Sequence, residues 1–147
     1  MSELPGSVLF ACTSNAIRSP MAEAIAKHYF GHRMYVDSVG IRCGDPDPFV
    51  VAVMDEIGID LSRHRAKTFD DLEDSSFDLV ITLSPEAQHR AVEMTRTMAC
   101  DVEYWQTFDP SVVQGSREVV LEAYRSVRDG LIDRIRDRFA TAPAASL

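Results

Sequence analysis

The fold is decided by the stretch VLFACTSNAIRSP, residues 8–20. Residues 7–11 are a short apolar run, which suits a buried β-strand and is too short for an α-helix. Residues 18–31 carry an apolar stripe at helical spacing, with Pro20 in a first-turn position and a glycine at the end. The residues between them are therefore predicted to form a loop that runs from the end of a strand to the N-terminus of a helix.

The rest of the chain goes on alternating between strand and helix patterns. Further strands are predicted at residues 34–41, 77–83 and 102–106, and further helices at residues 46–57, 85–94 and 116–139. This order predicts a single-domain, three-layer α/β fold in which a four-stranded parallel sheet has helices on both faces. Because such sheets bind ligands at the carboxyl ends of their strands, the loop after the first strand is the first place to look for a site.

Length and composition agree with one globular domain. The chain has 147 residues, of which 46% are apolar and 26% charged, close to the averages of soluble proteins. A chain of this size buries enough surface to fold without a disulfide or a metal. We expect residues 1–140 to form the domain and the Ala-, Pro- and Ser-rich residues 141–147 to be a disordered tail.

Charge and hydropathy limit the partners and the compartment. The net charge of −8 argues against nucleic acid or a membrane surface as a partner. The apolar runs are far shorter than the ~20 residues of a membrane span, and residues 1–5 lack a basic or apolar leader. Three cysteines, an odd number, argue against a disulfide framework. We therefore expect a cytoplasmic protein that attracts any anionic substrate through local groups.

The predicted loop combines a thiol, a run of small residues and an arginine. Backbone N–H groups of such a run can turn inward as an anion-binding nest, and the helix N-terminus that follows favours negative charge. Arg18 adds a planar fork of donors that fits two phosphate oxygens, and the same positive field stabilises the thiolate form of the nucleophile Cys12. The predicted phosphate-binding residues are Thr13, Ser14, Asn15, Ala16, Ile17 and Arg18.

A purely structural explanation is available for the same residues. A cysteine at a strand end is often a small buried hydrophobe, and an arginine at a given spacing from it also arises by chance. The position between a buried strand and a helix that starts with proline favours the chemical interpretation.

These residues resemble the signature of the low-molecular-weight protein-tyrosine-phosphatase and arsenate-reductase-like family, in which a loop C-x-G-N-x-C-R-S-P precedes a helix. Cys12, Asn15, Arg18, Ser19 and Pro20 match that signature position for position. The resemblance implies a phosphomonoester hydrolase, of the protein-tyrosine-phosphatase type, that works through a cysteinyl-phosphate intermediate. It also implies that Asn15 shapes the loop and that Ser19 donates a hydrogen bond to the thiolate. Ser19 can alternatively be read as a helix N-cap.

The loop departs from the family signature at two positions. Ser14 stands where the family has glycine, so the backbone is expected to differ slightly there. Ile17 stands where the family has a second cysteine, which removes the usual internal disulfide partner of the nucleophile.

Asp109, followed by Pro110, is the candidate proton donor. It lies just after the predicted fourth strand, at the same edge of the sheet as Cys12. Cleavage of a phosphate ester needs a proton for the leaving oxygen, and the resemblance implies that this Asp-Pro pair supplies it. Without the first loop, the dipeptide would indicate no more than a turn.

The resemblance is weaker around the substrate. Many tyrosine-specific members carry tyrosines directly after the Asp-Pro pair, whereas this chain has Ser111 and Val112. Phe49, Trp105 and Phe108 could offer aromatic surface instead, although core packing is the commoner use of such side chains. A preference for phosphotyrosine therefore does not follow from the sequence.

Two other functions stay open. One is an arsenate reductase on the same fold, since such enzymes attack arsenate with the first-loop cysteine and resemble this chain in the Asn-Ala-x-Arg-Ser portion of the loop. Thioredoxin-coupled members, however, need two further cysteines near the exit of the third strand, where this chain reads LSPE at residues 83–86. Cys43 is the one other thiol expected near the site, because Cys100 is expected at the opposite edge of the sheet. The other alternative is a catalytically idle module that binds phosphorylated partners, which would need neither a nucleophile nor an acid.

No cofactor and no metal are expected. The four histidines, His28, His32, His64 and His89, lack metal-ligand spacing and are interpreted as surface or rim residues. Nucleotide-binding glycine patterns are missing, and the acidic stretch 70–78 is predicted to be a solvated helix and turn. The expected partners are a phosphorylated protein or a small phosphomonoester, with inorganic phosphate or another oxyanion in the site.

Overall fold

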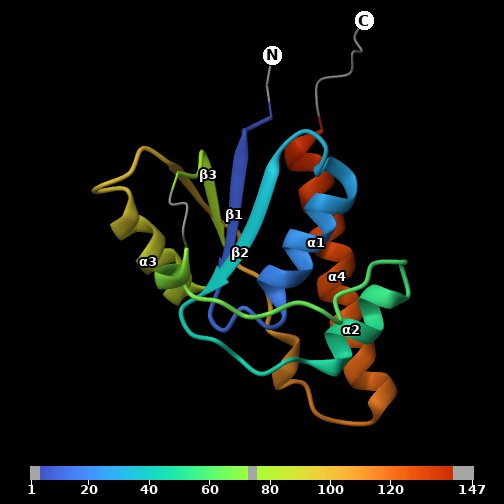
Figure 1. Ribbon diagram of the computed structural model, residues 1–147. Coiled ribbons are helices and arrows are strands. Elements are labelled where there is room, and N and C mark those ends of the chain that lie inside the picture. The colour runs from blue at the N-terminus through green and yellow to red at the C-terminus, as the bar shows by residue number, and fades with distance from the viewer. Residues whose placement is uncertain (1–3, 73–75, 141–147) are drawn as a thin grey trace, which may run out of the picture.

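The sheet of the protein has four parallel strands in the order β2-β1-β3-β4 (Figure 1). The computed structural model describes residues 4–72 and 76–140. The strands are β1 (Ser7–Cys12), β2 (Tyr35–Gly40), β3 (Leu79–Thr82) and β4 (Asp101–Tyr104). The predicted parallel sheet is therefore confirmed.

Helices cover both faces of this sheet, as Figure 1 shows. They are α1 (Arg18–Phe30), α2 (Pro48–Asp55), α3 (Pro85–Met94) and α4 (Arg117–Phe139), with short 3₁₀ helices at Phe69–Asp71 and Pro110–Val112. Side chains of α1, α2 and α4 share one hydrophobic core with one face of the sheet, and α3 packs on the other face in a second core. The expected three-layer arrangement is thus confirmed.

The first strand shows why its sequence is apolar throughout. Val8, Phe10 and Cys12 point into the core beneath α1 and α4, whereas Leu9 and Ala11 point into the core beneath α3. A central parallel strand buries both of its faces, so apolar residues follow one another instead of alternating with polar ones. The strand ends at Cys12, which places the thiol at the carboxyl edge.

Helix starts differ slightly from the prediction because of their caps. The α2 helix begins at Pro48 instead of residue 46, since the Asp47 side chain accepts hydrogen bonds from the backbone N–H groups of Phe49 and Val50. Likewise, Ser116 is the cap of α4, not its first residue. The third and fourth strands are shorter than predicted, although single hydrogen bonds continue past their ends, from the N–H of Leu83 to Ala11 and from that of Trp105 to Thr82.

The parallel register brings four loops to one edge of the sheet. Cys12 lies opposite Gly40 of β2, and the ends of β3 and β4 are in register through Thr82 and Tyr104. The loops that follow these strands therefore meet at the carboxyl edge. Cys100 directly precedes β4 and lies at the opposite edge, as predicted.

Most of the acidic stretch 70–78 lies within the described residues. Phe69–Asp71 forms a 3₁₀ helix, and the carboxylate of Asp71 accepts a hydrogen bond from the backbone N–H of Thr68. Glu73 and Asp74, like the predicted disordered tail at residues 141–147, lie outside the described residues. Within residues 4–72 and 76–140, no helix has the length and hydrophobicity to span a membrane.

Candidate active site

The loop after β1 is held in place by its carbonyl oxygens. Cys12, Thr13 and Ser14 accept hydrogen bonds from the backbone N–H groups of residues 41, 42 and 44, at 3.2, 3.0 and 2.8 Å. Among the described residues, no backbone N–H of residues 13–17 donates to a protein group. The amides of the loop thus remain free for an anion, as a nest requires.

Gly40 allows the loop to approach β2 this closely. A Cβ atom on Gly40 would lie 2.6 Å from the backbone nitrogen of Asn15 and 2.8 Å from the carbonyl carbon of Ser14. Ser14 itself causes no strain, because Asn15, with a φ of 52°, is the one residue other than glycine that has a positive φ in the described chain. Ser14 therefore replaces the family's glycine without adopting a left-handed backbone.

The nucleophile candidate lies in a buried hydrogen-bond network. Cys12 is 2% exposed, and its Sγ is 2.9 Å from the Oγ of Ser19. Asn15 donates through Nδ2 to the same Oγ at 2.8 Å. Because this bond occupies an acceptor position of the Ser19 hydroxyl, its single proton is left for the Cys12 sulfur or for the carbonyl oxygen of Val39, which lies 3.3 Å from the same Oγ. Ser19 is not the helix cap, since α1 has Ile17 at that position without a side-chain cap.

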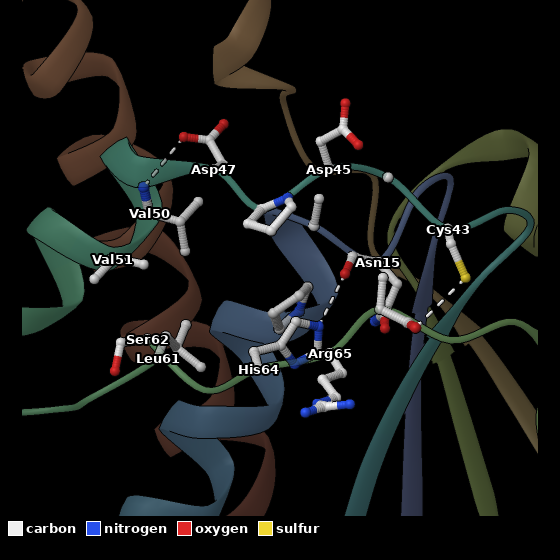
Figure 2. Close-up of a pocket in the computed structure, with 15 residues that line it drawn as sticks. Asn15, Cys43, Asp45, Asp47, Val50, Val51, Leu61, Ser62, His64 and Arg65 are labelled. Atoms are coloured by element: carbon white, nitrogen blue, oxygen red, sulfur yellow. Dashed lines mark hydrogen bonds between the residues drawn. The ribbon is translucent and has the colours of Figure 1, made fainter.

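Asn15 is fixed from several directions. Its Nδ2 also donates to the Oγ of Ser38 at 3.0 Å, and its Oδ1 accepts from the backbone N–H of Lys67 at 3.0 Å. His64 lies 2.9 Å from the Asn15 carbonyl oxygen through Nε2, and a carbonyl can only accept, so Nε2 carries the proton. Figure 2 shows this contact beside the loop. These bonds stabilise a left-handed backbone that costs free energy in any residue except glycine.

The ammonium group of Lys67 anchors the same segment to β2. It lies 2.7 Å from the carboxylate of Asp37, and the Lys67 carbonyl accepts a hydrogen bond from Gly40. Burial alone would lower the pKa of Lys67, but the hydrogen bond and charge of Asp37 raise it above the ordinary value. The ion pair therefore persists at neutral pH and holds residues 64–68 beside the end of β2.

Arg18 lies at the junction of the loops. Its Nη1 donates to the carbonyl oxygens of Thr107 at 3.0 Å and Leu83 at 3.4 Å, which follow β4 and β3. Within the described chain, Nη2 and Nε of Arg18 donate to no protein group. The arginine is therefore tied to the scaffold through one nitrogen while the others remain available for oxyanion oxygens.

Asp109 lies on the neighbouring loop. Its Oδ1 accepts hydrogen bonds from the backbone N–H of Ser111 at 3.0 Å and the Ser111 hydroxyl at 2.7 Å, which caps the 3₁₀ helix that Pro110 begins. Burial, the hydrogen bond to Asp47 and the charges of Asp47 and Asp109 raise the pKa of Tyr124. The charge of Asp109 thus reaches Tyr124 of α4. One oxygen of the Asp109 carboxylate is held by Ser111, and the other has no bond to a described residue.

Thr13 connects the loop to the start of α3. Its hydroxyl lies 3.0 Å from the Oγ of Ser84 and 3.1 Å from Oε1 of Glu86. Arg42 approaches the other oxygen of Glu86 at 3.8 Å, and both side chains are mostly exposed. A carboxylate therefore lies at the solvent edge of the loop after β1.

Comparison with known proteins places this arrangement in a family. The model of the family described as low molecular weight phosphotyrosine protein phosphatase matches residues 7–142, which include the loop, the Asp-Pro pair and all four strands. The chain belongs to this family. Its members are enzymes that work through a cysteine, which agrees with the buried thiol at the centre of the network.

Relatives within the family carry two kinds of name. An arsenate reductase of Bacillus subtilis (strain 168) is 35% identical over 130 residues, which are 88% of this chain and 92% of that protein. The solved structure of an arsenate reductase in the phosphate binding state has a TM-score of 0.71 and 28% identity, with 91% and 96% of the two chains covered. A low molecular weight protein tyrosine phosphatase from T. tengcongensis has a TM-score of 0.74 and 27% identity, with 92% and 99% covered.

A pocket of about 340 Å³ lies beside the loop of this family member, next to the His64 contact (Figure 2). Its apolar lining comes from α2 and the segments around it: Ala16, Pro20, Pro46, Val50, Val51 and Leu61. Cys43 lies at its border, where its Sγ donates to the carbonyl oxygen of Ala66 at 3.4 Å. Neither Cys12 nor Arg18 lines this pocket, so it is separate from the space between the candidate nucleophile and the arginine.

The aromatic candidates have separate positions. Trp105 is 4% exposed and packs against Phe10, so its predicted core role is confirmed. Phe49 is half-buried and packs on Tyr124 with a ring separation of 5.3 Å. Phe108 is 57% exposed beside Asp109, so core packing was the wrong prediction for it. Val112 is also exposed. The surface directly after the Asp-Pro pair is thus formed by Ser111 and Val112 and not by the tyrosines of many tyrosine-specific members.

All three thiols are free, and they lie in different environments. Cys12 is buried, Cys43 is exposed and Cys100 is half-buried. Burial and the charge of Asp101 raise the pKa of the Cys100 thiol, which keeps that sulfur protonated at neutral pH. Among the described residues, no group of histidine, cysteine, aspartate or glutamate side chains is arranged to hold a metal ion.

Sequence reasoning missed the residues that hold Asn15 from outside its own loop. Ser38 and the Lys67 backbone were not candidates, and His64 was interpreted as a rim residue without a role. One signal for Ser38 exists in the sequence: Asp37 and Ser38 interrupt an otherwise apolar strand, and buried polar residues need partners.

Proposed function

We propose that this protein is a phosphomonoester hydrolase of the protein-tyrosine-phosphatase type that acts through a cysteinyl-phosphate on Cys12. The observation that carries the proposal is the 2.9 Å contact between the buried Cys12 thiol and Ser19, at the base of a loop whose backbone amides are free. A buried thiol that served packing alone would need neither a hydroxyl partner nor a loop of unbonded amides beside it.

In the proposed reaction, the Cys12 thiolate attacks phosphorus, an S–P bond forms and the bond from phosphorus to the leaving oxygen breaks. Asp109, protonated at this stage, gives its proton to that oxygen. Water then attacks the phosphorus, Asp109 takes a proton from it, and the S–P bond breaks to release phosphate and the thiolate. The free amides of residues 13–17 and the unoccupied nitrogens of Arg18 hold the phosphoryl oxygens throughout.

The proposed substrates are a phosphorylated protein or a small phosphomonoester, handled in the cytoplasm without a cofactor. The direct test is release of p-nitrophenol from p-nitrophenyl phosphate in the absence of any reductant. Hydrolysis would also exclude the idle phosphate-binding module, which binds the ester without turnover. No release from folded protein that binds vanadate would favour that module over the hydrolase.

The proton-donor role of Asp109 predicts a dependence on the leaving group. Asp109→Asn should slow hydrolysis of an alkyl phosphate by about 10²–10³-fold and that of p-nitrophenyl phosphate by about tenfold, because a good leaving group needs less help from an acid. The measurement is kcat for both substrates. Equal losses on the two would assign Asp109 a positioning role instead.

The control for this variant is Asp60→Asn. Asp60 accepts a hydrogen bond from the backbone N–H of Ser62 at 2.8 Å, the same turn that Asp109 makes with Ser111, but it contacts none of Cys12, Arg18 and Asp109 and does not line the pocket. Asparagine can still accept this bond in both variants. Asp60→Asn should therefore leave kcat unchanged on both substrates.

A second candidate function is arsenate reduction, which the names of the 35% identical relative and of a solved neighbour favour. A reductase that resolves its own cysteine adduct must bring a second thiol within about 7 Å, measured between Cα atoms. Ser84 and Pro85 follow β3, and Cys100 is at the far edge, so Cys43 is the remaining choice.

These alternatives predict different results with arsenate. As a phosphatase, the protein should show little thioredoxin-dependent arsenate reduction, and Cys43→Ser should leave p-nitrophenyl phosphate hydrolysis within about twofold, since an exposed thiol outside the nest contributes little to it. NADPH consumption in a coupled thioredoxin assay measures the reduction. Robust reduction that disappears in Cys43→Ser would move the protein to the reductase class with Cys43 as the resolving residue.

A further inference from the structure

We infer that Glu86 is a specificity-determining residue that makes this enzyme favour phosphorylated residues flanked by arginine or lysine. The inference rests on the proposed phosphatase function and names the substrate class of that same site. It starts from the position of the carboxylate: Oε1 of Glu86 is 3.1 Å from the hydroxyl of Thr13, the residue directly after the nucleophile. The Glu86 side chain is 58% exposed, so solvent and a bound substrate can reach its carboxylate.

A negative charge in this place has no evident use for binding phosphate. It repels the phosphoryl dianion and the thiolate, against which the rest of the loop offers only positive dipoles and Arg18. Nor does Thr13 require it. The single hydroxyl proton of Thr13 has another acceptor, the Oγ of Ser84, at 3.0 Å. Glu86 also lies in the first turn of α3, where the helix dipole favours a carboxylate. That role does not require the side chain to turn toward Thr13 at the edge of the loop, whereas a positive group on the substrate would give this orientation a use.

The nearest protein cation does not neutralise the carboxylate. Arg42 lies 3.8 Å from Oε2 of Glu86, and its side chain is 65% exposed. Such a loose pair in solvent is weak and exchanges readily with another cation. The backbone N–H of Arg42 binds the Thr13 carbonyl, which keeps this arginine at the edge of the loop whichever way its side chain turns. A basic residue of the substrate can thus take the place of the Arg42 guanidinium.

Two further features of the protein agree with recognition by charge. Ser111 and Val112, at the positions where many tyrosine-specific members carry tyrosines, offer no ring on which a substrate side chain could stack. The net charge of −8 adds a long-range attraction for basic peptides, which a test of Glu86 must separate from its local effect.

The test compares two phosphotyrosine peptides that differ only in having arginine or glutamate on both sides of the phosphorylated residue. For each, kcat/KM is divided by that for p-nitrophenyl phosphate, so that general damage to the loop cancels. At low ionic strength the wild-type protein should favour the arginine peptide about 3–5-fold, the range of one or two exposed ion pairs, and the preference should shrink in 0.5 M NaCl. In Glu86→Gln, which keeps an acceptor for Thr13 but loses the charge, the preference should fall below about 1.5-fold.

Glu93→Gln is the matched control. Glu93 is on the same helix, changes the net charge equally and pairs only with His89 among described residues, at 3.9 Å. Its peptide preference should equal that of the wild type. An unchanged preference in Glu86→Gln, or an equal loss in Glu93→Gln, would overturn the inference.

The same comparison can be made without turnover. In the Cys12→Ser background, the Kd of each peptide is measured by fluorescence anisotropy with and without Glu86→Gln. If p-nitrophenyl phosphate is not hydrolysed, the proposed function fails, but the ratio of the two Kd values still decides whether Glu86 selects basic flanks. A Kd ratio that Glu86→Gln does not alter would reject the role of Glu86 independently.

Discussion

Cys12→Ser should reduce hydrolysis of p-nitrophenyl phosphate by at least about 10⁴-fold, because it removes the nucleophile of a covalent mechanism. Serine keeps the size of the side chain and can still bond to Ser19, so the fold and the nest should persist. The variant should therefore bind vanadate or phosphate with an affinity close to that of the wild type. Steady-state kinetics and isothermal titration calorimetry measure the two halves of this expectation.

The control is Cys100→Ser, which changes the same atom at the opposite edge of the sheet. It should leave both turnover and anion binding unchanged. Turnover that survives in Cys12→Ser would remove the covalent intermediate from the mechanism. Loss of anion binding together with turnover would indicate that the thiol supports the loop structurally, and the kinetic result would then say nothing about a nucleophile.

The inner part of the site could be predicted from sequence because its residues are neighbours in the chain. A buried strand, a loop of small residues and a helix follow one another within residues 7–31, and strand-to-helix geometry alone places Cys12 below the helix N-terminus. Asp109 could be placed at the same edge because parallel strands share it. Its role as a proton donor, however, was implied by the resemblance of the Asp109-Pro110 pair to the family and not by the pattern alone.

The contacts that hold Asn15 from other loops and from β2 could not be predicted in the same way. Asn15 contacts Ser38, His64 and the Lys67 backbone, which are 23, 49 and 52 residues away. No periodicity in a single sequence marks such pairs, because each depends on how a loop of irregular structure returns to the sheet. The polar residues inside β2 showed that partners were needed, but not which ones.

Fold and loop alone also do not separate the two activities found among the relatives. A nest of amides and an arginine binds any tetrahedral oxyanion, so phosphate and arsenate are equivalent to it. The difference lies in what happens after the thiolate attacks: water must reach the phosphorus adduct, or a second thiol must reach the arsenic adduct. Cys43 borders the pocket beside the loop and bonds to Ala66. Whether its sulfur can approach that of Cys12 therefore decides between the two activities.

Arg18→Lys should lower kcat/KM by about 10²–10³-fold although the charge is conserved, because the transition state loses a two-point contact to its equatorial oxygens. In this protein the loss has a second cause. Arg18 donates through Nη1 to the carbonyl oxygens of Leu83 and Thr107, which fixes one nitrogen of the fork and leaves the others without a bond to a described residue. A lysine has one nitrogen, which can bind those carbonyls or the phosphoryl group but cannot span both.

This reasoning predicts that phosphate affinity and rate fall together in Arg18→Lys, whereas in Cys12→Ser only the rate falls. The control is Arg33→Lys, in the turn after α1 at the far edge of the sheet, where the guanidinium packs over Phe30 at 5.8 Å. It should cost little stability and no activity. Wild-type kcat/KM in Arg18→Lys would show that a point charge is sufficient. The free amides of residues 13–17 would then be the groups that orient the phosphoryl oxygens.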